Sequence, residues 1–121
     1  MALILIVDDS PTEVHVMKKA LEKGGFTTAT AGDGQEGVRL AREMHPDLIF
    51  MDIVMPGMNG YQATRAIMND PDTRLIPIVM VTSKGHDTDR VWGLRQGAVD
   101  YLVKPVSPDV LVEKAQSTLA A

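Results

Sequence analysis

Short apolar runs alternate along this chain with longer stretches in which apolar residues recur every three or four positions. The runs have the length of strands, and the longer stretches have the period of helices. We expect strands near 2–8, 26–31, 47–52, 76–82 and 98–103. We expect helices near 11–24, 34–45, 60–70, 87–97 and 108–120. Strands that alternate with helices form a parallel sheet covered on both faces, so the predicted fold class is α/β.

Local signals support two of these elements in particular. Ser10 is a good N-cap for the first helix, Pro11 suits its first turn, and Glu13 completes a capping box. The second strand, 26–31, alternates in polarity and is rich in threonine, which is typical of an edge strand.

Composition narrows the classes of protein. The length of 121 residues predicts one domain over residues 1–121. A net charge of −4 argues against nonspecific nucleic-acid binding, and the lack of cysteine excludes disulfides and thiolate metal sites. No apolar run approaches the ~20 residues that span a bilayer, and the first strand leaves no room for a signal peptide. We expect a cytoplasmic monomer that binds neither nucleic acid nor membrane.

Four of the predicted strands end in residues that can bind a phosphate group, accept it or bind its counter-ion. These residues are Asp8-Asp9, Asp52, Thr82-Ser83 and Lys104-Pro105. Ligands of an open parallel sheet bind outside the carboxyl ends of its strands, so these side chains should converge there. A carboxylate can attack phosphorus, and Mg²⁺ takes one or two carboxylates together with water and phosphate. The set therefore suggests a hard cation beside Asp52, which would accept a phosphoryl group, with Lys104 as its ion-pair partner.

Each of these residues also has a structural explanation when it is taken alone. Asp8 or Asp9 could cap the following helix, and Asp52 could be an ordinary turn residue. The two hydroxyl residues could cap the next loop, and the lysine could be solvated at a strand exit. Pro105 permits a cis peptide bond, which would aim the lysine ammonium inward. The strength of the signal lies in four such features, each at the end of a strand.

The motifs that contain these residues resemble the receiver domain of two-component response regulators, the family of the chemotaxis protein CheY. They span residues 6–10, 51–60, 81–83 and 101–105, at the spacings expected over the whole chain. The resemblance implies a flavodoxin-like sheet of five parallel strands in the order 2-1-3-4-5 with five helices. It also implies Mg²⁺ as the cofactor and the phosphotransfer domain of a histidine kinase as the phosphodonor.

The resemblance assigns roles to single residues around the metal. Asp52 would accept the phosphoryl group and would also ligate Mg²⁺. Asp9 and the backbone carbonyl of Val54 would be further direct ligands, and Asp8 would hold the metal largely through water.

A second group of residues would bind the phosphoryl group or respond to it. Lys104 would pair with the phosphoryl oxygens, and Thr82 would move to donate a hydrogen bond to them, with the hydroxyl of Ser83 beside it. Tyr101 would then swing inward behind Thr82. The resulting change would reach a surface formed by the helix near 87–97, the last strand and the last helix.

A finer resemblance is to the single-domain PilH-type regulators of type IV pilus twitching motility. It is carried by residues 8–13, 51–65 and 91–98. Val54 and Lys84 follow Asp52 and Thr82 by two positions, and in this family such positions shape the access of water to the aspartyl phosphate. They are apolar and basic here, so the lifetime of the phosphoryl group does not carry over from the chemotaxis protein.

Trp92 is the only tryptophan in the chain. Val91 and Leu94 form the expected core face of its helix, which leaves Trp92 to the side. It could be a docking anchor for a partner, since tryptophan is enriched at interface hot spots, or it could pack on its own loop.

Other functions fit the sequence less well. An aspartyl-phosphate phosphatase of the haloacid dehalogenase class needs a second aspartate two residues after the nucleophile, where this chain has Val54. A flavin carrier of the same fold needs a hydroxyl- and glycine-rich loop after the first strand, where Asp8 and Asp9 would repel the flavin phosphate. The remaining alternatives concern the pathway: a receiver that acts as a phosphate sink, or one that serves flagellar chemotaxis or another system.

Overall fold

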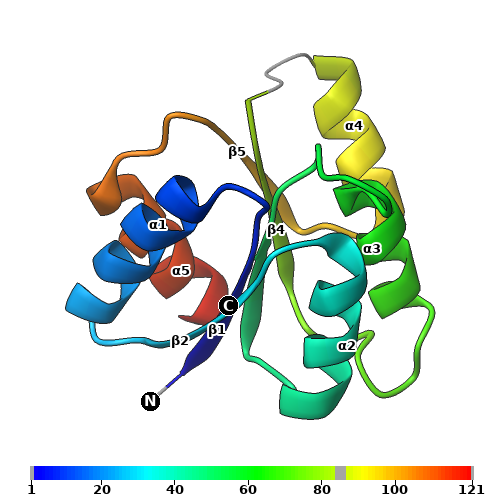
Figure 1. The fold of residues 1–121 in the computed structure, drawn as a ribbon, viewed down its shortest axis with the longest axis horizontal. Helices are drawn as coiled ribbons and strands as arrows, with labels where there is room; N and C mark the ends of the chain where they lie inside the picture. Colours follow the sequence, from blue (N-terminus) through cyan, green and yellow to red (C-terminus); the bar gives the residue numbers. More distant parts are fainter. Residues whose placement is uncertain (1, 84–86, 121) are drawn as a thin grey trace.

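A computed structural model describes residues 2–83 and 87–120, and it contains every strand and helix that the hydrophobic pattern predicts, within two residues at each end (Figure 1). The strands are β1 (Leu3–Val7), β2 (Thr27–Ala31), β3 (Leu48–Met51), β4 (Ile78–Thr82) and β5 (Asp100–Val103). The helices are α1 (Pro11–Lys23), α2 (Gly34–Met44), α3 (Gly60–Met68), α4 (Asp87–Gln96) and α5 (Pro108–Ala120).

The five strands form one sheet in the order β2-β1-β3-β4-β5, and every neighbouring pair is parallel. Helices α1 and α5 cover one face of the sheet, and α2, α3 and α4 cover the other (Figure 1). The threonine-rich strand β2 lies at an edge, as its alternating sequence predicts. The fold is therefore the flavodoxin-like arrangement expected from the resemblance.

The sheet divides the hydrophobic core into two clusters, because successive side chains of a strand point to opposite faces. Ile4, Ile6 and Phe50 belong to the cluster under α1 and α5. Leu5 and Met51 belong to the cluster under α2 and α3. Both faces of the central strands are thus buried, which explains why these strands read as uninterrupted apolar runs.

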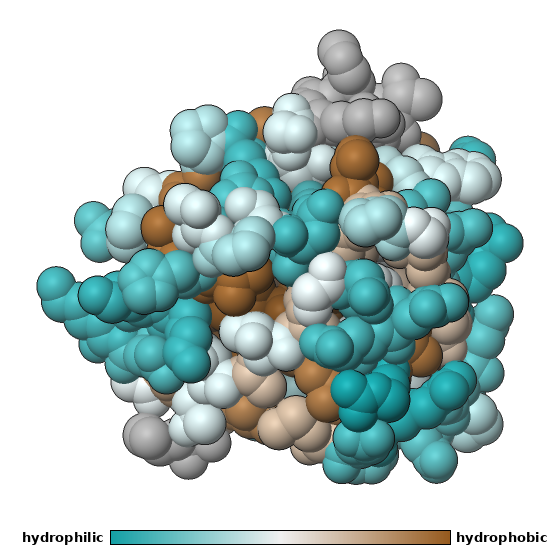
Figure 2. Space-filling model, in the orientation of Figure 1, coloured by the Kyte–Doolittle hydropathy of each residue, from teal (hydrophilic) through white to brown (hydrophobic). Residues whose placement is uncertain are grey.

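The outer surface is polar over most of the face seen in Figure 2. Hydrophobic residues come to this surface mainly near the centre of the view, where Figure 1 places the sheet between the two helix layers. Over the described part of the chain, every helix is too short or too polar to cross a lipid bilayer.

The start of α1 corrects one prediction. Ser10 caps the helix, and its Oγ accepts a hydrogen bond from the Glu13 backbone N–H at 3.3 Å. The capping box does not form, because the Glu13 carboxylate contacts Lys104 and the Ser10 N–H donates instead to Asp8 Oδ1 at 2.9 Å. The sequence pattern was right about the cap and wrong about the partner of the glutamate side chain.

Helix α4 corrects a second prediction. Val91 and Leu94 are 50% and 39% exposed, so they do not form its core face. Gly93 and Gln96 are the buried positions within residues 90–96. A Cβ atom built on Gly93 would lie 3.3 Å from Met80 Cγ, which places the bare backbone of α4 directly against β4. An apolar pattern cannot mark a face that is made of glycine and glutamine.

Candidate functional site

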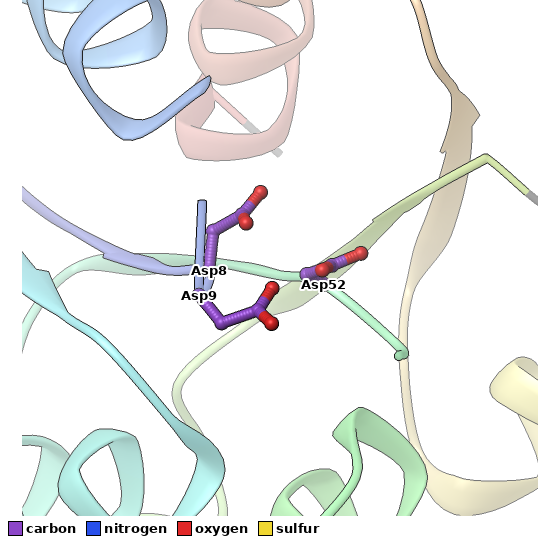
Figure 3. A group of neighbouring side chains, drawn as sticks. All are labelled: Asp8, Asp9 and Asp52. Carbon is purple, nitrogen blue, oxygen red and sulfur yellow. The ribbon is translucent and has the colours of Figure 1, made fainter. Parts of the chain in front are cut away.

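Three carboxylates meet at the carboxyl ends of β1 and β3 (Figure 3). Asp8, Asp9 and Asp52 each offer an oxygen atom, and these atoms lie within 4.8 Å of one another. Asp8 and Asp52 are buried, whereas Asp9 is exposed and extends toward Asp52. The cluster is therefore closed on the side of the sheet and open to solvent on the side of Asp9.

The sheet itself positions these side chains. The Asp8 N–H donates to Ala31 O at 3.1 Å, and the Asp52 N–H donates to Val7 O at 2.9 Å, so strand pairing continues up to the site. Beyond Asp52, the Gly60 N–H donates to Ile53 O at 2.8 Å, and a Cβ atom on Gly60 would lie only 2.0 Å from Asp52 O. The absence of a side chain at this position lets the start of α3 pack against the backbone that carries Asp52.

Lys104 brings a positive charge to the same edge from the end of β5. Its Nζ lies 2.8 Å from Asp8 Oδ2, 2.6 Å from Glu13 Oε2 and 3.4 Å from Asp52 Oδ1. The Lys104 N–H donates to Thr82 O at 2.7 Å, and the peptide bond between Lys104 and Pro105 is cis. The lysine is thus fixed at both its backbone and its ammonium group.

Burial dominates the electrostatics of Asp52. Burial and, to a smaller extent, the negative charge of Asp8 raise the pKa of this carboxyl, the charge of Lys104 lowers it, and the net result is a pKa of about 6. Burial alone would lower the pKa of Lys104, but hydrogen bonds to Asp8 and Glu13 and the charge of Asp52 outweigh it, so the pKa lies above its ordinary value. Asp52 is a partly desolvated carboxylate at neutral pH, and Lys104 is firmly protonated.

The other expected site residues lie on the strands next to this cluster. Thr82 is fully buried at the end of β4, and the following residue, Ser83, is exposed. Tyr101 is half-buried on β5, in register with Met80, and β5 borders β4. The side chain of Val54 is exposed just beyond Asp52. Lys84 lies outside the described residues.

Trp92 contacts an aromatic side chain of α3. Its ring lies edge-on to the ring of Tyr61, with the centroids 6.4 Å apart, so it packs across α4 onto the first turn of α3. The tryptophan is still 46% exposed, which leaves much of the ring on the surface.

Sequence reasoning missed the place of Glu13 in this cluster. The residue lies on α1, 91 positions before Lys104, and the apolar runs that indicated the other residues end at strands. Its position three residues after Ser10 gave a complete local explanation, which concealed its long-range partner.

The chemistry of the cluster fits a magnesium ion. All of its candidate ligands are carboxylate oxygens, which are hard donors, and one or two carboxylates with several waters are what Mg²⁺ ordinarily takes. The solvent-exposed side next to Asp9 leaves room for water and for an anionic group. Asp8, Asp9 and Asp52 are the side chains that could hold such an ion.

Comparison with known proteins agrees with the geometry. The response regulator receiver domain matches residues 4–116 of this chain. The chain is 52% identical over 120 residues to the protein PilH of Pseudomonas aeruginosa, and the alignment covers 99% of both chains. Further curated relatives are 40% identical over 116 residues, and the chain spans about half of their length.

Solved structures give the same picture. The chemotaxis protein CheY4 of Vibrio cholerae has a TM-score of 0.92 and 32% identity, covering 97% of this chain and 98% of that chain. The receiver domain of the sensor histidine kinase PA1611 of Pseudomonas aeruginosa has a TM-score of 0.92 and 32% identity, covering 99% of this chain and 98% of that chain. In that structure a magnesium ion is coordinated in the active site cleft.

Proposed function

This chain belongs to the response regulator receiver family, and we propose that Asp52 is the residue that accepts a phosphoryl group from a histidine kinase. The observation that carries the proposal is the placement of Asp52 between two further carboxylates and the ammonium of Lys104 at one edge of the sheet. A site that alternates between a carboxylate and its phosphorylated form has a use for all four groups.

In the proposed reaction a carboxylate oxygen of Asp52 attacks phosphorus. The new O–P bond forms as the P–N bond to the donor histidine breaks, and the electron pair of that bond returns to the imidazole. Because the transition state of such a transfer is loose, positioning and charge neutralisation supply most of the catalysis. Burial limits the solvation of Asp52, so its lone pairs are more available to an incoming phosphoryl group than those of a fully hydrated carboxylate.

Asp9, Asp52 and the backbone carbonyl of Val54 are the proposed ligands of Mg²⁺, with Asp8 acting through water. A bound magnesium ion would neutralise the charge that develops on the phosphoryl oxygens. Lys104 would donate to one of these oxygens from its own side of the site. The exposed position of Asp9 keeps one side open for the donor.

We further propose that Thr82, Ser83 and Tyr101 respond to the phosphoryl group. Thr82 would donate a hydrogen bond to a phosphoryl oxygen, and Ser83 would line its approach. Tyr101 lies close to Gly93, where a Cβ atom would be 3.9 Å from Tyr101 Cδ2. A shift of Tyr101 would therefore displace the backbone of α4, and the surface around Trp92 would change.

The biological setting is proposed from the full-length similarity to PilH. Residues 1–121 would act as a receiver domain by themselves. They would accept a phosphoryl group and would not act as an enzyme on another substrate. It would belong to a chemotaxis-like system that controls type IV pilus twitching. Deletion of the gene should disturb twitching, and the parent gene should restore it where Asp52→Asn does not. Normal twitching with altered swimming would instead favour a flagellar pathway.

Intact mass spectrometry tests the chemical proposal. Incubation with acetyl phosphate and Mg²⁺ should add one phosphoryl group to the parent protein and none to Asp52→Asn. The labelling should disappear when EDTA removes the metal. Undiminished labelling of the Asp52→Asn variant would show that another residue is the acceptor.

A further inference from the structure

One ammonium is shared by three carboxylates at the edge of the site. Lys104 Nζ lies 2.6 Å from Glu13 and 2.8 Å from Asp8, but 3.4 Å from Asp52. An ammonium has three N–H donors, and two of them are held in hydrogen bonds that do not involve Asp52. The closest partner of Lys104 is therefore a glutamate on α1 that the mechanism does not use.

Phosphoryl transfer changes what Lys104 must do, a step that rests on the proposed function. A carboxylate with one negative charge becomes an acyl phosphate with about two, and it gains oxygen atoms that accept hydrogen bonds. Lys104 is tied through its backbone to Thr82, so only its side chain can adjust. One N–H of the ammonium is left for these oxygens, so a second hydrogen bond to them requires the ammonium to give up one of its two present partners.

Asp8 and Glu13 differ in how much it costs them to lose the hydrogen bond to Lys104. The Asp8 side chain is 2% exposed, and an unpaired carboxylate at such a position is strongly disfavoured. The Glu13 side chain is 45% exposed, so water can solvate it when Lys104 leaves. A shallow cavity of about 150 Å³ beside it, lined in part by Val16 and Val106, gives the glutamate room to turn aside.

We propose that Glu13 is a positioning residue that competes with the phosphoryl group for Lys104. It holds the ammonium toward α1 while Asp52 is unmodified and releases it when the phosphoryl group arrives. Breaking this contact is part of the barrier to phosphorylation, so the glutamate sets how fast the site loads. Weakening the contact between Glu13 and Lys104 should therefore accelerate phosphorylation of Asp52. Damage to the site would slow the same reaction.

Initial rates of phosphorylation by acetyl phosphate with Mg²⁺ test this role. In that reaction the O–P bond to Asp52 forms, the P–O bond to the acetyl group breaks, and acetate leaves with the electron pair. Glu13→Gln keeps the size of the side chain and removes its charge. Glu13→Asp keeps the charge and shortens the reach to Lys104. Glu22→Gln removes an equal charge from the far end of the same helix and serves as the matched control.

We expect Glu13→Gln to load about fivefold faster than the parent, the size typical of coupling between contacting groups, and Glu13→Asp to load faster as well. Glu22→Gln should load at the parent rate. If Glu13→Asp behaves like the parent while Glu13→Gln is faster, simple repulsion of the anionic donor explains the result and the proposal fails. It also fails if both variants load at the parent rate or more slowly.

A direct measurement separates the role of Glu13 from that of Asp52. In nitrogen NMR, the Lys104 ammonium of the parent should shift when beryllium fluoride and Mg²⁺ are added as a phosphoryl mimic. Before addition, Glu13→Gln should already lie part of the way toward that shifted position. An unchanged ammonium signal in this variant overturns the role of Glu13. A parent that is not labelled at Asp52 overturns the proposed function and removes the basis of the inference with it.

Discussion

Asp52 is ionisable, nearly buried and next to another carboxylate, and this combination governs its behaviour. The residue is 7% exposed, and burial and Asp8 together outweigh the attraction of Lys104. The folded protein therefore favours the protonated form of this side chain more than the unfolded chain does. The negative charge of Asp52 therefore destabilises the fold at neutral pH, and a bound metal ion or a chemical modification of the carboxylate can reduce that cost.

The pH dependence of stability follows from this pKa. A carboxyl whose pKa is raised on folding, here from 3.8 to about 6, stabilises the fold fully below the lower value and loses that contribution as the pH rises through the higher one. In EDTA, Asp52→Asn should exceed the parent in free energy of unfolding by up to about 3 kcal/mol above neutral pH. The advantage should shrink toward pH 4, as measured by urea unfolding. An advantage independent of pH would contradict the raised pKa.

Asp9 offers a complementary test, because it is the exposed member of the cluster. Without metal, Asp9→Asn should unfold at a higher temperature than the parent, since it relieves repulsion of about 1 kcal/mol. Adding Mg²⁺ should stabilise the parent strongly and this variant weakly, as measured by calorimetry. A variant that melts lower than the parent in EDTA, yet gains as much from Mg²⁺, would contradict the role of Asp9 in the cluster.

The side chains of the site were partly visible in the sequence. Asp8, Asp52 and Lys104 could be predicted because each follows an apolar strand, and parallel strands end at one edge. Glu13 could not, because its contact with Lys104 depends on where the start of α1 lies relative to the residue that follows β5, and a local pattern contains no information about that placement. The rule that works for strand ends does not extend to helix side chains that cross to another element.

Among the helices and strands, the junction between β3 and α3 is the most tightly constrained near the site. The start of α3 lies against the carbonyl of Asp52, and there is no space for a side chain at Gly60. This contact couples the position of the helix to the backbone that carries Asp52.

Gly60→Ala should therefore be severely destabilising. The added methyl would lie 2.0 Å from Asp52 O, and the backbone would have to move at a cost of about 3 kcal/mol. Gly32→Ala is a suitable control, because a methyl there has no neighbour within 4 Å. Urea unfolding of both variants should show a large loss for the first and little change for the second. Equal stabilities would mean that α3 does not press on the site.

The order of the elements was predictable, but the orientation of one helix was not. Alternating strand-length runs and helical periods predicted every helix and strand of the described residues, because a sheet covered on both faces requires apolar residues on a regular pattern. In α4, the buried positions near its end are Gly93 and Gln96, and Gln96 Oε1 accepts a hydrogen bond from Arg65 Nε at 2.8 Å. A face built from a small residue and a satisfied polar residue gives no hydrophobic signal.

Across the molecule, the proposed switch connects the cluster at the strand ends with the surface of α4. Phosphorylation would favour one of two packings of the residues between the site and α4. It can shift the equilibrium between them only by the difference in free energy with which the phosphoryl group interacts with each. Thr82 is buried beside the cluster, Tyr101 lies on the neighbouring strand, and Trp92 contacts Tyr61 on α3. Trp92 is thus an intrinsic probe of that change.

Trp92 fluorescence should change when the parent is phosphorylated with Mg²⁺ present. Thr82→Ala should still accept the phosphoryl group, as intact mass will show, but should lose more than about half of the fluorescence change, because the population shift depends on the new hydrogen bond. Asp52→Asn should show no change under the same conditions. A full response in Thr82→Ala would mean that the coupling does not pass through Thr82.

The identity of the phosphorylated residue is the most direct test of the proposed function. Borohydride reduces an aspartyl phosphate to homoserine, which tandem mass spectrometry can locate within a peptide. After treatment with acetyl phosphate and Mg²⁺, homoserine should replace aspartate at position 52 and nowhere else. Homoserine at position 8 or 9, or unmodified aspartate throughout a protein that carries the added mass, would contradict the assignment of Asp52 as the phosphoacceptor.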